Sequence, residues 1–318
     1  MNLGYVIAND TDMKRACMLT HQARRLNSPS LFVVNNDARF LPNLRIDDNQ
    51  NNLKFDRILC DVPCSGDGTF RKNFGLWRNF HNHMGHNNHT LQLEILERGF
   101  KLLKKGGRLV YSTCSFNPIE NEAVVACAVA RHIKQVKIVD VSNEVSPLLK
   151  YRPGLLNWKV FHRGKGAREK AMWYNNFKSV PDWRQKIVKE SMFTDAYTDY
   201  NNDEENLNKI DPLGLKHCMR FYPHDDNSGG FFVCVIEKIF DEDEGIIYDD
   251  DYSQDAWNNP NVRQKDIIDD LQDFVKDFEQ AIKDQEKATG EEDDGEELTL
   301  MKEMLAQQIE DKQKEKAE

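Results

Sequence analysis

Three aspartates and one cysteine each lie just after a predicted β-strand: Asp10, Asp37, Asp61 and Cys114. In an open α/β sheet, ligands bind in the crevice beyond the carboxyl ends of the strands, so we expect these side chains to face one site. A carboxylate accepts several hydrogen bonds, which suits a ligand with hydroxyl groups, such as a ribose. Each aspartate alone has a simpler interpretation as the cap of the helix or turn that follows it. Three aspartates together with a cysteine favour a site.

The loop after the third strand, residues 61–69, reads Asp-Val-Pro-Cys-Ser-Gly-Asp-Gly-Thr and carries a second cysteine, Cys64. Gly66 and Gly68 allow another backbone to approach closely. The loop lacks the Gly-Lys-Ser/Thr that a phosphate-binding loop needs, so we exclude that function. Cys60 and Cys64 have three residues between them, which could suggest zinc, but no second pair is present. We expect Cys60 to point into the sheet and predict no metal here.

Four histidines, His81, His83, His86 and His89, lie within nine positions. A metal cluster is one interpretation, because imidazole is a good metal ligand. We favour a polar, irregular loop before the next helix, because Asn and Gly residues surround these histidines.

Alternating strands and helices must position the chemical residues. Short apolar runs predict strands at 4–8, 31–34, 57–60, 108–111 and 231–239. Apolar residues spaced by three and four predict helices at 12–26 and 90–103 and from 118 through 128. This alternation indicates a parallel α/β sheet. Residues 151–228 give no clear pattern.

The composition excludes several classes of protein. No apolar run reaches the ~18 residues that a membrane-spanning helix needs, and residues 1–12 do not resemble a secretory signal. Seven cysteines without regular spacing fit a reducing compartment better than a disulfide framework. The formal net charge is −10, but residues 241–318 hold 27 Asp and Glu against 9 Lys and Arg. A basic body, compatible with a polyanionic partner, therefore precedes an acidic tail.

Two long runs resemble the motifs of a known family, the Sun-domain RNA (cytosine-5) methyltransferases. Residues 56–69, followed by Arg71-Lys72-Asn73, resemble its motif IV, and residues 107–115, followed by Asn117-Pro118-Ile119-Glu120, resemble its motif VI. Segments 6–10, 21–23, 223–224 and 229–232 are similar to the eukaryotic tRNA (cytosine-5) methyltransferase branch. The resemblance covers residues 3–240. Two motifs in the right order, each with its cysteine, make it specific.

The resemblance implies a Rossmann-like methyltransferase sheet that uses S-adenosylmethionine to methylate carbon 5 of cytosine in RNA, with tRNA as the substrate class. By match to motif VI, Cys114 would add as a thiolate to carbon 6 of the base and make carbon 5 nucleophilic. By match to motif IV, Cys64 would assist release of the covalent adduct. Asp61 would bind the base or the methyl donor. Asp10 and Asp37 match positions at the ribose and adenine ends of the donor.

The resemblance also implies partners and a location. The target base must leave any stack, so it would lie in a loop or be flipped out. The branch implies the nucleus, with the cytoplasm as the alternative because no convincing basic import cluster is present. We expect neither a metal nor a membrane partner. The sequence does not indicate an oligomeric state.

The family's first strand and the glycine-rich loop after it, resembling Ala-Pro-Gly-Ser-Lys-Thr, would precede Asp10, yet only nine residues do so. In the family that loop holds the methionine end of the donor. We therefore expect an N-terminally truncated sheet that binds the donor poorly and is less stable, because the missing strand would be central. The alternative hypothesis is a catalytically inactive fragment that binds RNA or a partner protein.

Three domains are predicted along the chain. Residues 1–240 would form the catalytic domain, residues 241–260 an acidic linker and residues 261–318 an acidic amphipathic helical tail. The tail is either a solvated appendage, which we favour, or a charge mimic that competes with RNA for the basic body.

Overall fold

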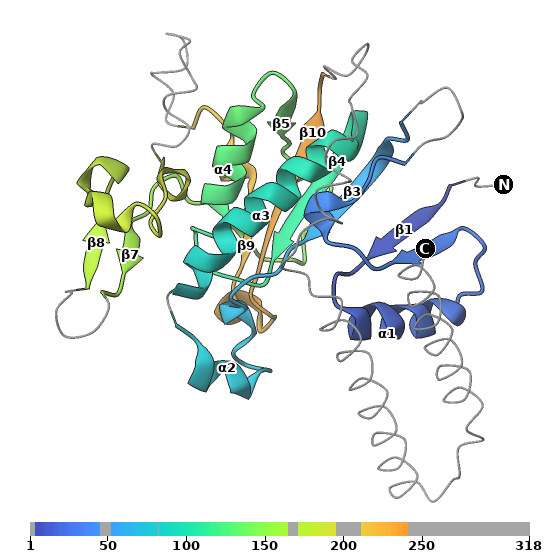
Figure 1. Cartoon of the computed structure of the whole chain (residues 1–318), viewed down its shortest axis with the longest axis horizontal. Helices are drawn as coiled ribbons and strands as arrows, with labels where there is room; N and C mark the ends of the chain where they lie inside the picture. The colour runs from blue at the N-terminus through green and yellow to red at the C-terminus, as the bar shows by residue number, and fades with distance from the viewer. Residues whose placement is uncertain (1–3, 45–51, 82, 165–170, 195–210, 241–318) are drawn as a thin grey trace, which may run out of the picture. The chain divides into compact units, whose positions relative to one another are not determined.

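The computed structural model describes residues 4–44, 52–81, 83–164, 171–194 and 211–240. They fall in two compact units, whose described parts are residues 4–36 and 37–240 (Figure 1). The predicted acidic linker and helical tail lie outside the described residues, and the division into three domains stays a prediction. None of the helices in the described ranges is long and apolar enough to cross a membrane.

The first unit is a short strand–helix–strand segment. Strands β1 (Val6–Asn9) and β2 (Leu31–Val34) pair in parallel, and helix α1 (Met13–Arg24) connects them. Asp12 begins the helix by accepting a hydrogen bond from the backbone N–H of Arg15, as an N-cap residue does. These bounds agree with the predicted ones to within two residues.

The second unit is built on a sheet with the strand order β3–β4–β10–β9–β6, in which β5 pairs with β10 beside β9. Its strands are β3 (Phe55–Asp61), β4 (Leu103–Thr113), β5 (Val136–Ile138), β6 (Arg152–Pro153), β9 (Met219–Phe221) and β10 (Phe231–Lys238). β3 and β4 are parallel, and β10 is antiparallel to β4, β5 and β9. β3, β4, β5 and β9 therefore point one way, while β10 and β6 run in the opposite direction.

The predicted α/β class and the alternation of strands and helices are confirmed. The sheet is mostly parallel in strand direction, as predicted, but β10 is antiparallel to its neighbours, which the prediction of a parallel sheet did not include. β1 and β2 form a sheet separate from that of β3 and β4. Because side chains alternate along a strand in the same way whatever its direction, an apolar run does not reveal which way the strand enters the sheet.

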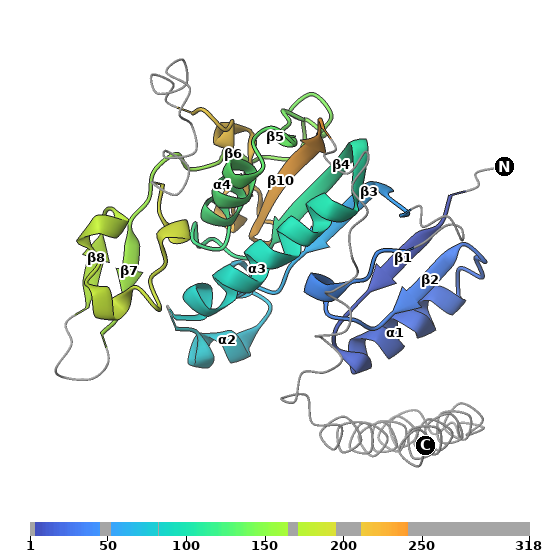
Figure 2. The same cartoon turned by 45° about the horizontal axis from the view of Figure 1, so that its top comes forward.

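Helices α3 (His83–Leu102) and α4 (Glu122–Arg131) lie side by side on one face of the larger sheet (Figure 2). The core forms between them and β4, where Leu96, Val125 and Leu109 are fully buried. Leu, Val and Ala residues fill this layer, and α4 is buried from Glu122 to Ala130. The layer fixes the end of β4 from which the site is built.

The prediction of an irregular loop around the four histidines was wrong for residues 83–89, because α3 begins at His83. His86, His89 and Leu93 recur at spacings of three and four and are buried on one face of the helix. This burial outweighs the weak helix propensity of the Asn and Gly residues between them.

The described residues between 151 and 228 (151–164, 171–194 and 211–228) fold mostly into short elements. They include the antiparallel pair β7 (Val160–His162) and β8 (Met172–Tyr174), the helix α5 (Pro223–Asp226), and the 3-10 helices η3 (Phe177–Ser179), η4 (Asp182–Arg184), η5 (Glu190–Met192) and η7 (Leu215–His217). Buried Trp158 donates a hydrogen bond to the carbonyl of Met192 at 2.8 Å and holds two of these pieces together. Elements of three or four residues are too short to show a hydrophobic period.

Candidate active site with two thiols

Two neighbouring parallel strands bring the two cysteines together. Cys114 comes directly after β4, and Cys64 lies three residues beyond β3. Asp61 at the end of β3 is opposite Ser112 of β4, so both chains leave the sheet at the same edge. The sulfur atoms of Cys64 and Cys114 lie 3.3 Å apart, within hydrogen-bonding distance.

The backbone of Gly68 connects the loop of Cys64 to the backbone at Cys114 and at Gly230. Its N–H donates to the carbonyl of Cys114 at 2.9 Å, and its carbonyl accepts from the N–H of Gly230 at 3.0 Å. A Cβ at position 68 would lie 2.7 Å from the carbonyl oxygen of Cys114 and 2.8 Å from that of Gly230. Only glycine allows three chain segments to meet this closely.

A buried carboxylate, Glu120, connects the two cysteine loops. It accepts hydrogen bonds from the N–H and hydroxyl of Ser65 at 2.8 and 2.5 Å and from the hydroxyl of Ser115 at 2.8 Å. The side-chain amides of Asn88 and Gln92 on α3 donate to it at 3.2 Å. No role was predicted for Glu120 beyond its place in a motif. The sequence does not reveal that Ser65 and Ser115, fifty residues apart, donate hydrogen bonds to the same carboxylate.

The two thiols differ in pKa. The hydrogen bond from Cys64 lowers the pKa of Cys114 to about 7, although burial and the negative charges of Asp61 and Asp67 act in the opposite direction. The same hydrogen bond raises the pKa of Cys64, and burial and the charges of Cys114 and Glu120 raise it further. Cys114 is therefore the thiolate of the pair and Cys64 the thiol, and a thiolate is the nucleophilic form.

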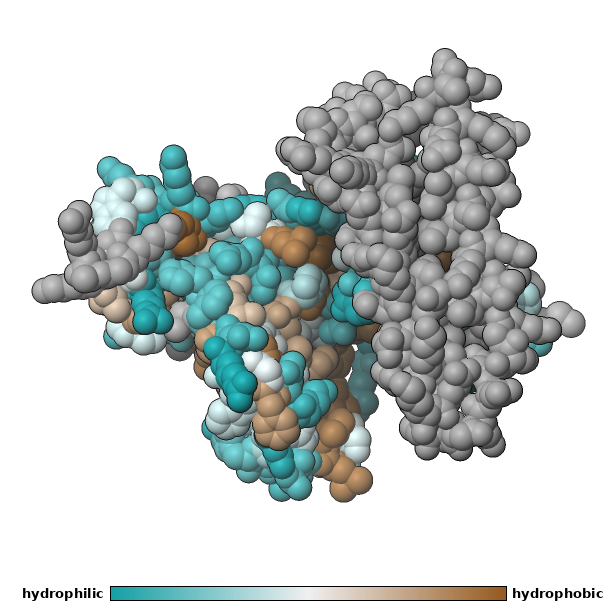
Figure 3. Space-filling view, turned by 60° about the horizontal axis from the view of Figure 1, so that its bottom comes forward, coloured by the Kyte–Doolittle hydropathy of each residue, from teal (hydrophilic) through white to brown (hydrophobic). Residues whose placement is uncertain are grey.

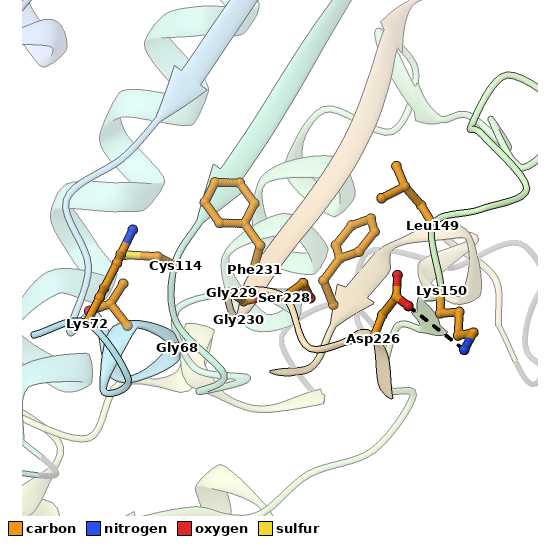
Figure 4. A pocket seen from close by; sticks show the side chains of 12 residues that line it. Gly68, Lys72, Cys114, Leu149, Lys150, Asp226, Ser228, Gly229, Gly230 and Phe231 are labelled. Atoms are coloured by element: carbon orange, nitrogen blue, oxygen red, sulfur yellow. Dashed lines mark hydrogen bonds and ion pairs between the residues drawn. The ribbon is translucent and has the colours of Figure 1, made fainter. Parts of the chain in front are cut away.

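Cys114 lies in the wall of a cavity of about 320 Å³ (Figure 4). Lys72 lies beside Cys114 in this view, and Lys150 and Asp226 form a distant ion pair of 3.9 Å at the other end. The remaining wall is formed by glycines 68, 229 and 230 together with Thr69, Leu149, Phe221, Ser228 and Phe231. Ligand pockets have volumes of about 300–1,000 Å³, so a cavity of this size can hold a flat aromatic ligand.

The three aspartates differ in their surroundings. Asp61 is exposed at the end of β3 and accepts a hydrogen bond from Ser112 at 2.9 Å. Asp10 accepts from the N–H of Asp12 and pairs with Arg15 at 3.0 Å. These positions can still accept further hydrogen bonds, because a carboxylate has about four acceptor directions.

Asp37 has the most complete set of partners. It caps the short 3-10 helix η1 (Ala38–Phe40) and holds the guanidinium of Arg39 through both carboxylate oxygens. Burial would raise the pKa of Asp37, but the hydrogen bonds and charge of Arg39 outweigh it and lower the pKa. The simpler interpretation as a cap therefore describes the present contacts of Asp10 and Asp37, which belong to different units.

A metal centre is not formed by the residues that the structure describes, since no group of three or more His, Cys, Asp or Glu side chains there could hold an ion. His89 is instead buried between helix and loop, with its ring nitrogens 2.7 Å from the carbonyl of Ile119 and 2.8 Å from the hydroxyl of Ser191. Cys60 is buried in the sheet, as expected.

Comparison with known proteins gives consistent results. Residues 1–154 match a family model described as 16S rRNA methyltransferase RsmB/F. The chain is 44% identical over 245 residues to the multisite-specific tRNA:(cytosine-C(5))-methyltransferase of Saccharomyces cerevisiae, covering 76% of this chain and 32% of that protein. It is 49% identical over 248 residues to the Schizosaccharomyces pombe protein of the same description, trm4b, covering 74% and 33%. The chain thus spans about a third of the length of these curated relatives.

A solved structure also aligns with part of this chain. A methyltransferase homologue from Pyrococcus horikoshii aligns with 74% of this chain and 54% of its own, at 23% identity and a TM-score of 0.42.

Proposed function

Because this chain belongs to the Sun-domain, or RsmB/F, family of RNA (cytosine-5) methyltransferases, we propose that it transfers a methyl group from S-adenosylmethionine to carbon 5 of cytosine in RNA, with tRNA as its substrate. The observation that carries the proposal is the 3.3 Å separation of the Cys64 and Cys114 sulfurs beside a cavity. One thiol is poised as a nucleophile, and a second lies close enough to exchange a proton with it.

Cys114 begins the reaction. Its thiolate adds to carbon 6 of the cytosine, the carbon 5–carbon 6 double bond becomes enamine-like, and carbon 5 becomes a nucleophile. S-adenosylmethionine, when bound, supplies an electrophilic methyl group. The lowered pKa of Cys114 supports this role, because it increases the fraction of the thiol that is ionised at neutral pH.

Cys64 assists the release of the product. When the sulfur of Cys114 becomes a thioether, it loses the negative charge that raises the pKa of Cys64. Cys64 then gives up its proton more readily, and its thiolate accepts the proton of carbon 5. The electron pair of that C–H bond re-forms the ring double bond and expels Cys114 as a thiolate, so both cysteines return to their starting states, and the net proton of the reaction leaves to solvent.

The aspartates are suited to the donor to different degrees. Asp61 is exposed beside the cysteine loops and would accept hydrogen bonds from the base or the donor. Asp10 keeps acceptor capacity for a ribose hydroxyl, as the family match suggests. Asp37 would first have to exchange the guanidinium of Arg39 for the donor, because both of its carboxylate oxygens accept hydrogen bonds from Arg39.

The surface next to the cavity suits RNA. Helix α2 (Phe74–Asn79) follows the basic pair Arg71 and Lys72, and its Phe74 and Trp77 are 78% and 69% exposed. Figure 3 shows apolar side chains among hydrophilic ones on the surface of this unit. Exposed aromatic rings stack on unpaired bases, and Lys and Arg side chains bind phosphates.

Methyl transfer tests the proposal. The full chain is incubated with labelled S-adenosylmethionine and a tRNA transcript, and we expect label in 5-methylcytosine that disappears in Cys114→Ser. Calorimetric titration with S-adenosylmethionine separates the alternative function. Saturable binding supports the enzyme, whereas absence of donor binding with retained RNA affinity would replace it by an inactive RNA-binding protein.

A further inference from the structure

Each of the two cysteines is followed directly by a serine, and both serines donate to the same carboxylate. The hydroxyls of Ser65 and Ser115 lie 2.5 and 2.8 Å from one oxygen of Glu120, and 3.1 Å from each other. The backbone N–H of Ser65 donates to the other oxygen at 2.8 Å. The relative position of the two sulfurs is thus set one residue away from each of them.

Glu120 and the two serines form a buried cluster that is held together by hydrogen bonds. Glu120, Ser65 and Ser115 are at most 2% exposed. The amides of Asn88 and Gln92, on α3, supply two further donors, so the carboxylate is anchored to the helix as well as to both loops. Removing a shared acceptor would leave several buried donors unsatisfied at once, which costs more than the bonds themselves contribute.

Glu120 differs from a buried carboxylate that merely balances a charge. Glu122, two residues further on, is also fully buried, but it is paired with the guanidinium of Arg220. In the part of the chain that the structure describes, the hydrogen bonds to Glu120 come from hydroxyl, amide and backbone donors, and no ion pair is formed. Its negative charge instead acts on Cys64, whose proton it helps to retain.

We propose that Glu120 is a positioning residue for the reaction: by binding Ser65 and Ser115 together, it holds the thiol of Cys64 at donating distance from the sulfur of Cys114. The role in catalysis rests on the proposed function, but the effect of Glu120 on the thiols does not. Glu120 acts through Ser65 and Ser115 and is not proposed to contact the base or the donor.

The test is the pH profile of cysteine alkylation in Glu120→Gln, a change of nearly equal shape. Iodoacetamide is added to the full chain at a series of pH values, and the modified cysteine is identified by mass spectrometry. We expect the rate at Cys114 at pH 7 to fall roughly tenfold and its midpoint to move upward, because the thiolate fraction falls when Cys64 no longer donates. Glu122→Gln is the matched control and should leave the midpoint unchanged.

Two further measurements keep the outcome decisive. Ser115→Ala removes one donor and keeps the carboxylate, so it should move the midpoint in the same direction by a smaller amount even if Glu120→Gln fails to fold. A folded Glu120→Gln or Ser115→Ala chain with an unchanged midpoint would overturn the proposal. If the unmodified chain has the low midpoint but transfers no methyl group, the proposed function fails while the positioning role stands.

Discussion

At the scale of single residues, the proposed reaction depends on two thiols of different acidity, Cys64 and Cys114. The pKa of Cys114, lowered to about 7, keeps a thiolate present above neutral pH, and the reactive form is lost as the pH falls below 7. Removing the donor in Cys64→Ala should raise this pKa toward the ordinary value of a thiol, about 8.5. The alkylation rate of Cys114 measured against pH should therefore shift its midpoint upward in the variant.

Other cysteines provide internal controls for this titration. Burial raises the pKa of Cys60 to about 12 and that of Cys127 to about 11, so neither should react in the same range. An unmodified chain in which Cys114 titrates like an ordinary thiol would contradict the hydrogen bond between the two sulfurs.

The sequence predicted the candidate site cysteines but not the contacts that hold them in place. Cys64 and Cys114 were identified from motifs, and the structure brings them into contact. Glu120, Ser65 and Ser115 received no role, because their shared hydrogen bonds arise only when loops far apart in sequence meet. Capping contacts of Asp10 and Asp37 could be predicted locally, since a cap lies within three residues of its partner.

At the scale of elements, the contact between the motif loops and the start of β10 gives a sharp prediction. In Gly68→Ala, the new methyl group would meet the carbonyls of Cys114 and Gly230, and backbone cannot move as a flexible side chain can. We expect a loss of about 1–3 kcal/mol in the free energy of unfolding, typical of overpacking. Urea denaturation measures it.

Gly229→Ala is the matched control for this change. A Cβ there meets no atom within 4 Å, so the free energy of unfolding should change little. Equal stability of the two variants would show that the three segments do not approach as closely as described.

Continuous apolar runs predicted the strands β2 and β10 well. β2 has the predicted bounds, and β10 was found from its apolar run. The first two turns of α3 were missed because polar residues fill a face that only tertiary packing buries. The direction of β10 could not be predicted, because the described elements between residues 151 and 228 are too short to show a hydrophobic period.

At the scale of the whole molecule, one buried histidine should make stability depend on pH. Burial lowers the pKa of His89 to about 4, whereas an unfolded chain binds this proton near pH 6.5. Between these values the unfolded state holds more protons than the folded state, so stability is lost as the pH falls from about 6.5 to about 4. The contribution of His89 is about 3 kcal/mol at most.

Urea denaturation at several pH values tests this dependence. His89→Gln should be less stable at neutral pH but should lose less stability on acidification. The exposed His81→Gln is the control and should keep the original slope. An unchanged slope in His89→Gln would assign the pH dependence to other groups.

The charge division also belongs to this scale. The acidic tail, residues 241–318, and a nuclear location stay predictions. If the tail competes with RNA for the basic body, its deletion should raise RNA affinity at low salt, where unscreened charges matter most. Unchanged affinity would leave it as a solvated appendage.

Trapping the covalent intermediate is the direct test of the reaction proposed for Cys64 and Cys114. The full chain carrying Cys64→Ala is incubated with tRNA and S-adenosylmethionine, the RNA is digested, and the protein is weighed and sequenced by mass spectrometry. We predict a methylated cytidine nucleotide bound to Cys114, absent when Cys114→Ala is added. No adduct in Cys64→Ala, or an adduct that persists in the double variant, would contradict the two-thiol mechanism.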